Sequence, residues 1–130
     1  MTRPALAVTE ESSEAIRLAP HNVEVERHLL GAILVNNDTF YRVSDFLLAE
    51  HFYLEPHRRI FETAAKLIRA GKVASPVTVK TFFPADATIA DLPVVQYLLR
   101  LAAAAAGVIN AEAYGRTVFD LTLGRTHIAI

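Results

Sequence analysis

The sequence of 130 residues contains no cysteine and no tryptophan, and it has no long uninterrupted apolar run. The absence of cysteine excludes a disulfide framework and thiolate metal sites, and it fits the reducing cytoplasm. The longest apolar stretch lies between Arg100 and Asn110 and is too short to span a bilayer. These absences favour a cytoplasmic protein that makes no membrane contact.

The chain also lacks a surplus of positive charge. It has 13 lysines and arginines against 14 acidic residues, which gives a formal net charge of -1 at pH 7. A dedicated DNA-binding domain usually carries a basic surplus, because phosphate contacts supply most of its affinity. We therefore expect only weak DNA binding by this segment. The hydrophobic content of 52% comes largely from alanine and aliphatic residues, a mixture typical of packed helices.

Motifs for catalysis and cofactor binding are missing as well. The single Gly-Lys pair, Gly71 and Lys72, has Lys66 where a phosphate-binding loop needs its first glycine. Five histidines do not form a set of three or four ligands at zinc-binding spacing, and His57 is interpreted as a local packing or hydrogen-bonding residue. Glu26 is explained by the favourable charge at a helix start. The prediction is that the chain is not itself an enzyme and holds no catalytic, cofactor-binding or metal residues.

The spacing of apolar residues predicts an all-α fold, a small helical bundle. Asn22 is a good N-cap for a helix over about 23–35, and Pro56 suits the first turn of another that Gly71 would end. Residues 77–83 alternate and are β-branched, which allows a strand. A short helix is the preferred interpretation, because a single strand would have no partner elsewhere in the sequence.

The pattern divides the chain into three parts. Residues 1–20 show no sustained period and are predicted to be a disordered tail, and residues 21–92 a globular helical head. Residues 93–127 are predicted to be an antiparallel helical hairpin, with a tight turn at Gly107 and a cap at Asn110.

The predicted hairpin is apolar on most sides, so a two-helix arm cannot bury all of it. Another copy of the chain is the expected cover, and the alternative is that the hairpin folds flat onto the head. The predicted self-association residues on the two arms are Val95, Leu98, Leu99, Leu101, Val118, Phe119, Leu121 and Leu123.

Several segments occur in the order found in one known family. They are Pro20–Leu34, Phe52–Tyr53 followed by His57, Val77–Thr78, Tyr97–Leu98 and Asn110–Arg116. Together they resemble the N-terminal domain of bacterial replicative DNA helicases, the DnaB family. The resemblance covers roughly residues 20–128 and rests on the combination, since each motif alone is mostly core and cap residues.

The resemblance implies a collar domain that assembles a helicase ring and recruits primase. It implies homo-oligomers, with a dimer of this fragment and a hexameric ring for the full protein, and a helicase loader as a further partner. ATP and magnesium would belong to an ATPase domain beyond these residues, and 128–130 would begin the linker to it. Tyr97 and Ile128 are the candidate primase contacts, because the Tyr97 ring can pack while its hydroxyl tolerates water.

Other interpretations remain open at this point. A stand-alone helical dimerisation or adaptor module has the same pattern, whereas a small helical enzyme lacks any catalytic constellation. A basic helix face could touch nucleic acid, although a solvated face of an amphipathic helix is the preferred interpretation. That face consists of Arg58, Arg59, Lys66 and Arg69.

Overall fold

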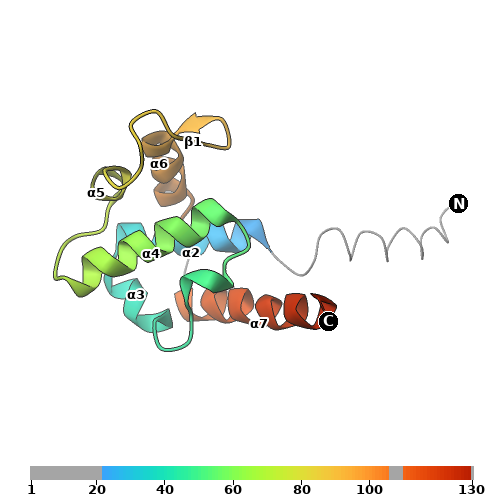
Figure 1. Ribbon diagram of the computed structural model, residues 1–130. Coiled ribbons are helices and arrows are strands. Elements are labelled where there is room, and N and C mark those ends of the chain that lie inside the picture. Colours follow the sequence, from blue (N-terminus) through green and yellow to red (C-terminus); the bar gives the residue numbers. More distant parts are fainter. Residues whose placement is uncertain (1–21, 106–109, 130) are drawn as a thin grey trace, which may run out of the picture.

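The computed structural model describes residues 22–105 and 110–129, with side chains through Thr122 in the last helix. Its described part is all-α apart from one two-residue ladder, as the sequence predicts (Figure 1). The predictions for residues 1–20 and for the turn at Gly107 lie outside the described residues. The elements are α2 (Val23–Val35), α3 (Asp38–Val43), η2 (Ala49–His51), α4 (Glu55–Arg69), α5 (Pro76–Lys80), β1 (Thr88–Ile89), β2 (Leu92–Pro93), α6 (Val94–Ala104) and α7 (Ala111–Ala129).

Helix α2 is the centre of the fold and spans the residues predicted for it. The Asn22 side chain accepts a hydrogen bond from the backbone N–H of Val25 at 3.1 Å, which caps its first turn. Every residue from Leu29 to Leu34 is buried, because α3, α4, α6 and α7 all pack against this helix. Burying one such leucine contributes about 1.5–3 kcal/mol relative to leaving it exposed.

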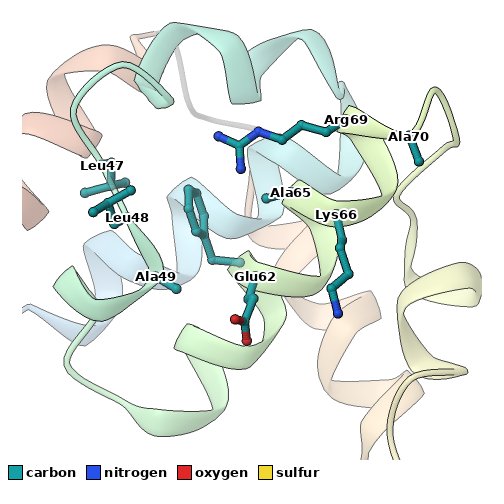
Figure 2. A pocket seen from close by; sticks show the side chains of 9 residues that line it. Leu47, Leu48, Ala49, Glu62, Ala65, Lys66, Arg69 and Ala70 are labelled. Atoms are coloured by element: carbon teal, nitrogen blue, oxygen red, sulfur yellow. The ribbon is translucent and has the colours of Figure 1, made fainter.

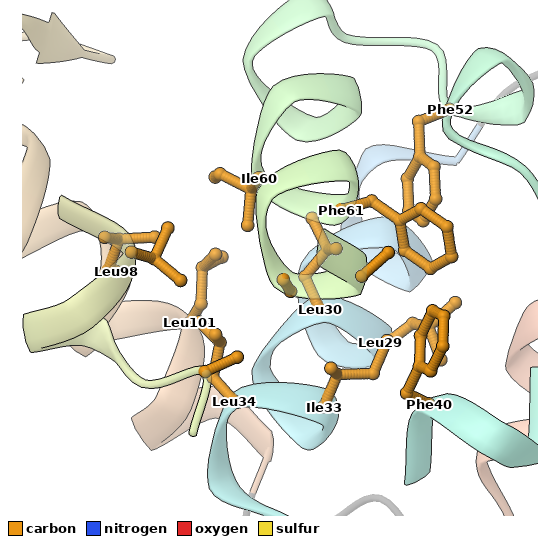
Figure 3. Close-up of a cluster of buried hydrophobic side chains, with 14 of the residues drawn as sticks. Leu29, Leu30, Ile33, Leu34, Phe40, Phe52, Ile60, Phe61, Leu98 and Leu101 are labelled. Atoms are coloured by element: carbon orange, nitrogen blue, oxygen red, sulfur yellow. The ribbon is translucent and has the colours of Figure 1, made fainter. Parts of the chain in front are cut away.

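The main core lies between α2, α4 and α6 (Figure 3). Helix α4 ends as predicted at Gly71, which has a φ of +77°. There the Gly71 N–H bonds the Ile68 carbonyl at 3.0 Å and the Lys72 N–H bonds the Leu67 carbonyl at 2.8 Å. This pair of bonds is the Schellman arrangement that glycine permits. The core residues that Figure 3 labels are Leu29, Leu30, Ile33, Leu34, Phe40, Phe52, Ile60, Phe61, Leu98 and Leu101.

Two short elements connect α4 to α6. Helix α5 confirms the helical interpretation of the β-branched segment, since Ser75 accepts from the Thr78 N–H and caps it. The antiparallel ladder of β1 and β2 pairs Ile89 with Leu92, and no pattern in the sequence predicts it. The turn between the strands places Ala90 and Asp91 at positive φ, 54° and 67°.

The predicted hairpin of residues 93–127 is not what the structure shows. Helix α6 packs chiefly on α2 and α5, whereas α7 packs on α2, α3 and η2, and within the described residues the two helices make little contact with each other. Figure 1 shows α6 and α7 on opposite sides of α2. The reason is that α6 and α7 each bury an apolar face against the head. This arrangement is closer to the alternative prediction, in which these residues fold flat onto the head. Residues 128 and 129 belong to α7.

Candidate functional site

Three of the predicted self-association residues belong to the core of their own chain. Leu98 is 0%, Leu101 1% and Val118 1% exposed. Leu98 and Leu101 lie on the face of α6 that meets the head, together with Val94. The assignment of these three side chains to a contact with another chain is therefore wrong for this fold, because none of them reaches the surface.

The other predicted self-association residues lie nearer the surface. Leu99 is 52% exposed, and Val95 is half-buried one turn before it on the outer side of α6. On α7, Phe119 and Leu121 are half-buried, and Phe119 packs edge-on against Phe46 and the ring of His51. The side chains of Leu123 and Ile128 lie outside the described residues.

Tyr97 is not the exposed partner contact that the sequence predicted. Its side chain is only 5% exposed, and its hydroxyl lies 2.6 Å from Nε2 of His57. The opposite ring nitrogen of His57, Nδ1, lies 2.8 Å from Oε1 of Glu26. The second carboxylate oxygen of Glu26 accepts the backbone N–H of Tyr53 at 2.6 Å. A chain of buried hydrogen bonds thus joins α2, α4 and α6.

One charged side chain, Arg27, interacts with the end of this network. A hydrogen bond to the Tyr97 side chain is the main cause that raises the pKa of Arg27 above its ordinary value, against a smaller opposing effect of burial. A carboxylate only accepts, so Nδ1 of His57 donates to Glu26. Nε2 of His57 and the Tyr97 hydroxyl share the second hydrogen bond, so each of these buried polar groups has a partner.

This network holds helices together and has no access for a substrate. His57 is 0% and Glu26 1% exposed, so no substrate could reach either group. The bonds of His57 join residues 31 and 40 positions away, which corrects the prediction of a purely local role. A signal for Glu26 was present in the sequence, because Glu26 lies three and seven positions before the core residues Leu29 and Ile33 and therefore on their face.

The basic face of α4 is largely occupied by contacts within the chain. The interactions are hydrogen bonds from Arg58 to the carbonyl oxygens of Phe52 and Tyr53, and placement of Arg59 over the Phe83 ring and of Arg69 over the Phe40 ring. Arginines used in this way brace loops and rings, which supports the interpretation of this face as a structural, solvated one.

A groove runs along the exposed side of α4 (Figure 2). Its floor is apolar and includes Phe61 and Ala65, with Leu48 on the opposite wall at 52% exposure. Glu62 and Lys66 project along its rim. We call this the α4 groove, with a volume of about 500 Å³, and it is lined by Leu47, Leu48, Ala49, Phe61, Glu62, Ala65, Lys66, Arg69 and Ala70.

Within the described residues, no three His, Asp or Glu side chains gather as a metal-binding group. The same part of the chain has no helix of the length and apolar character needed to cross a membrane.

Comparisons with known proteins agree with the architecture. Residues 18–120 match the model of the DnaB-like helicase N-terminal domain. Replicative DNA helicase DnaB of Rickettsia typhi is 37% identical over 114 residues, which are 88% of this chain and 23% of the relative. The corresponding helicase of Rickettsia felis is 36% identical over 126 residues, 96% of this chain and 26% of the relative. The chain thus spans about a quarter of the length of these relatives.

Two solved structures share the fold. The N-terminal domain of DnaB helicase from Mycobacterium tuberculosis superposes with a TM-score of 0.76 at 23% identity, covering 85% of this chain and 80% of that one. The N-terminal domain of the Helicobacter pylori DnaB helicase, described with its interactions with primase, has a TM-score of 0.68 at 22% identity, covering 89% and 88%. Given a family match over residues 18–120, the chain belongs to the family of DnaB-like helicase N-terminal domains.

Proposed function

We propose that this chain serves as the N-terminal, non-motor domain of a replicative DNA helicase, where it takes part in ring assembly and primase recruitment. The observation that carries the proposal is the family match over residues 18–120, together with relatives that are replicative helicases. The Helicobacter pylori domain is described as interacting with primase, which supports the same role here. Such a protein would act on chromosomal DNA in the cytoplasm.

The ATP and magnesium chemistry of such a helicase would belong to another part of the protein, because these 130 residues contain no phosphate-binding loop. With a net charge of -1, the chain would bind single-stranded DNA only in the non-specific range of roughly 10⁻⁴ to 10⁻⁶ M. Fluorescence anisotropy with a labelled oligonucleotide at physiological salt tests this, and nanomolar binding would contradict it.

Self-association would use the outer side of α6. Val95, Leu99 and Ala102 follow each other at intervals of four and three residues and form an apolar stripe on that side, with Leu99 the most exposed of them. No acidic residue lies in α6 to oppose the approach of an apolar surface. The half-buried Phe119 and Leu121 of α7 are the remaining candidates on the second helix.

The test uses two leucines with the same exposure. Leu99 and Leu48 are each 52% exposed, but Leu48 lies in the α4 groove, away from the outer stripe of α6. In analytical ultracentrifugation, Leu99→Asp should shift the chain toward the monomer, whereas Leu48→Asp should keep the wild-type mass. Both should keep the wild-type circular dichroism, since neither side chain is part of the core. If Leu99→Asp associates like the wild type, the outer side of α6 is not the self-association surface.

Primase recruitment is tested separately by isothermal titration of this chain with the primase of the same organism. Measurable binding by the wild-type chain and by Leu99→Asp is the expected result. No heat at high micromolar concentrations would contradict recruitment through this domain while leaving the self-association result unaffected.

A further inference from the structure

A second groove lies between the start of α2, the β1–β2 turn and the side of α6 that carries Tyr97 and Arg100. Its volume is about 470 Å³. We propose that this α2–α6 groove binds an acidic peptide segment of another protein, a role that goes beyond the proposed ring assembly. The groove is lined by Glu24, Arg27, Ala90, Leu92, Tyr97, Arg100, Leu101 and Ala104.

The charges in the groove favour a carboxylate. Arg27 is 40% exposed at its side chain and bonds Glu24 at 3.0 Å, which balances one positive charge. Arg100 is exposed, and none of the acidic side chains in the described residues forms an ion pair with it. Among the described residues, the groove therefore presents one guanidinium without an acidic partner, a group whose planar donors match a carboxylate.

Arg27 is held in place before any ligand arrives. Its guanidinium interacts with the Tyr97 hydroxyl and with Glu24, and both interactions raise its pKa, so it remains cationic. Tyr97 is in turn fixed by His57 at 2.6 Å inside the core. A donor anchored in this way loses little freedom when it binds a second acceptor, which favours recognition over a mobile surface cation.

The wall opposite the arginines is held by backbone pairing and by packing on α6. The turn that carries Ala90 is closed by the pairing of Ile89 with Leu92 and packs against α6. Leu92 and Ala104 add apolar surface beside the cations. A ligand with an aliphatic side chain next to a carboxylate would satisfy both features of the groove.

The same features favour a peptide over nucleic acid. The apolar surface of Leu92 and Ala104 has no counterpart in a string of phosphates, whereas a peptide can place an aliphatic side chain against it. A volume of about 470 Å³ accommodates a few side chains and is too small for a duplex.

The experiment titrates the isotopically labelled chain with an acetylated hexapeptide of alternating leucine and glutamate, followed by nuclear magnetic resonance. Amide signals of Ala90, Leu92 and Ala104 should shift, and the matching leucine–lysine hexapeptide should move none of them. Arg100→Glu should weaken binding by about tenfold or more, because it places a carboxylate against the ligand. The matched control Lys72→Glu makes the same change of charge on an exposed loop residue outside the groove and should bind like the wild type.

Each opposite result would overturn the proposal. The α2–α6 groove would not be an acidic-peptide site if the lysine peptide bound equally well or if Arg100→Glu kept its affinity. The same would follow from shifts confined to the α4 groove. A thymidine oligonucleotide that moves the same signals at lower concentration than the acidic peptide would assign the groove to nucleic acid instead. The dispersion of the Arg100→Glu spectrum shows whether the variant is folded, and Arg100 makes no internal ion pair in the described residues whose loss would unfold it.

Discussion

Helices α6 and α7 both pack against the head, but they do so differently. Helix α6 buries Val94, Tyr97, Leu98 and Leu101 against the head and is also tied to it by the hydrogen bond between Tyr97 and His57. Helix α7 buries only the small residues Ala111 and Gly115 together with Val118 among its described side chains, and the half-buried rings of Tyr114 and Phe119 pack beside them. The apolar pattern on most sides of α6 therefore corresponds to two faces, one buried in the core of its own chain and one exposed as a stripe at the surface.

Each helix also needs one glycine for close approach. Gly31 of α2 admits α6, because a Cβ there would lie 1.9 Å from the Leu101 carbonyl oxygen. Gly115 of α7 admits α3, where a Cβ would lie 2.5 Å from Cγ1 of Val43. The added Cβ would meet backbone in the first case and a side chain in the second. The contact of α6 should therefore tolerate an added methyl group less well than the contact of α7.

The largest effect should come from the two adjacent leucines of α6. Leu98→Asp puts a charge at a position that is 0% exposed, and we expect it to lower the free energy of unfolding by more than about 4 kcal/mol. Leu99→Asp, at 52% exposure, should change it by less than about 0.5 kcal/mol. Urea denaturation followed by circular dichroism measures both. Similar losses for the two variants would mean that α6 has no distinct inner and outer face.

The glycine at the α6 contact should rank second. Gly31→Ala forces the backbone of α6 away from α2, and we expect a loss of about 3 kcal/mol despite the better helix propensity of alanine. The same urea titration gives the value. A loss below that of Gly115→Ala would reverse the proposed order of tolerance between the two helices.

Local features of the sequence predicted local structure well. The cap at Asn22 and the ending at Gly71 were correct, because both depend on residues within one turn of themselves. The predicted pairing of α6 with the last helix was wrong, since a helical period shows that a face is buried and does not show which element covers it. The ladder at Ile89 and Leu92 is too short to produce a period at all.

The functional groups were harder to predict than the helices. Glu26 and His57 are 31 residues apart, and their pairing depends on how α2 and α4 cross. The charge at Glu26 had a sufficient local explanation in the helix dipole, which concealed its buried position. The surface role of Leu99 is still a prediction, because a single chain does not show what covers its exposed side.

A smaller effect is expected at the α7 contact. Gly115→Ala meets the end of the Val43 side chain, which can yield, and alanine improves the helix, so we expect a net loss of about 1 kcal/mol. The double variant with Val43→Ala should show a favourable coupling energy in a double-mutant cycle, since the smaller side chain leaves room for the new methyl group. Additive losses would mean that Val43 is not the obstacle.

The smallest effect, and the one stabilising change, belongs to the turn that leads into α6. Ala90 has a φ of +54°, a conformation that costs a residue with a Cβ about 1–2 kcal/mol and costs glycine almost nothing. Ala90→Gly should therefore raise the free energy of unfolding by about 0.5 kcal/mol, after allowing for the greater freedom of glycine in the unfolded chain. Ala85→Gly is the matched control in the same connection, because Ala85 is exposed and has no positive φ. That variant should lose about 0.5 kcal/mol, since it gains the same unfolded freedom without any relief of strain. Opposite signs for the two substitutions in urea titrations would place strain in the turn before α6, whereas a loss in both would show that the turn is relaxed and that α6 is docked without it.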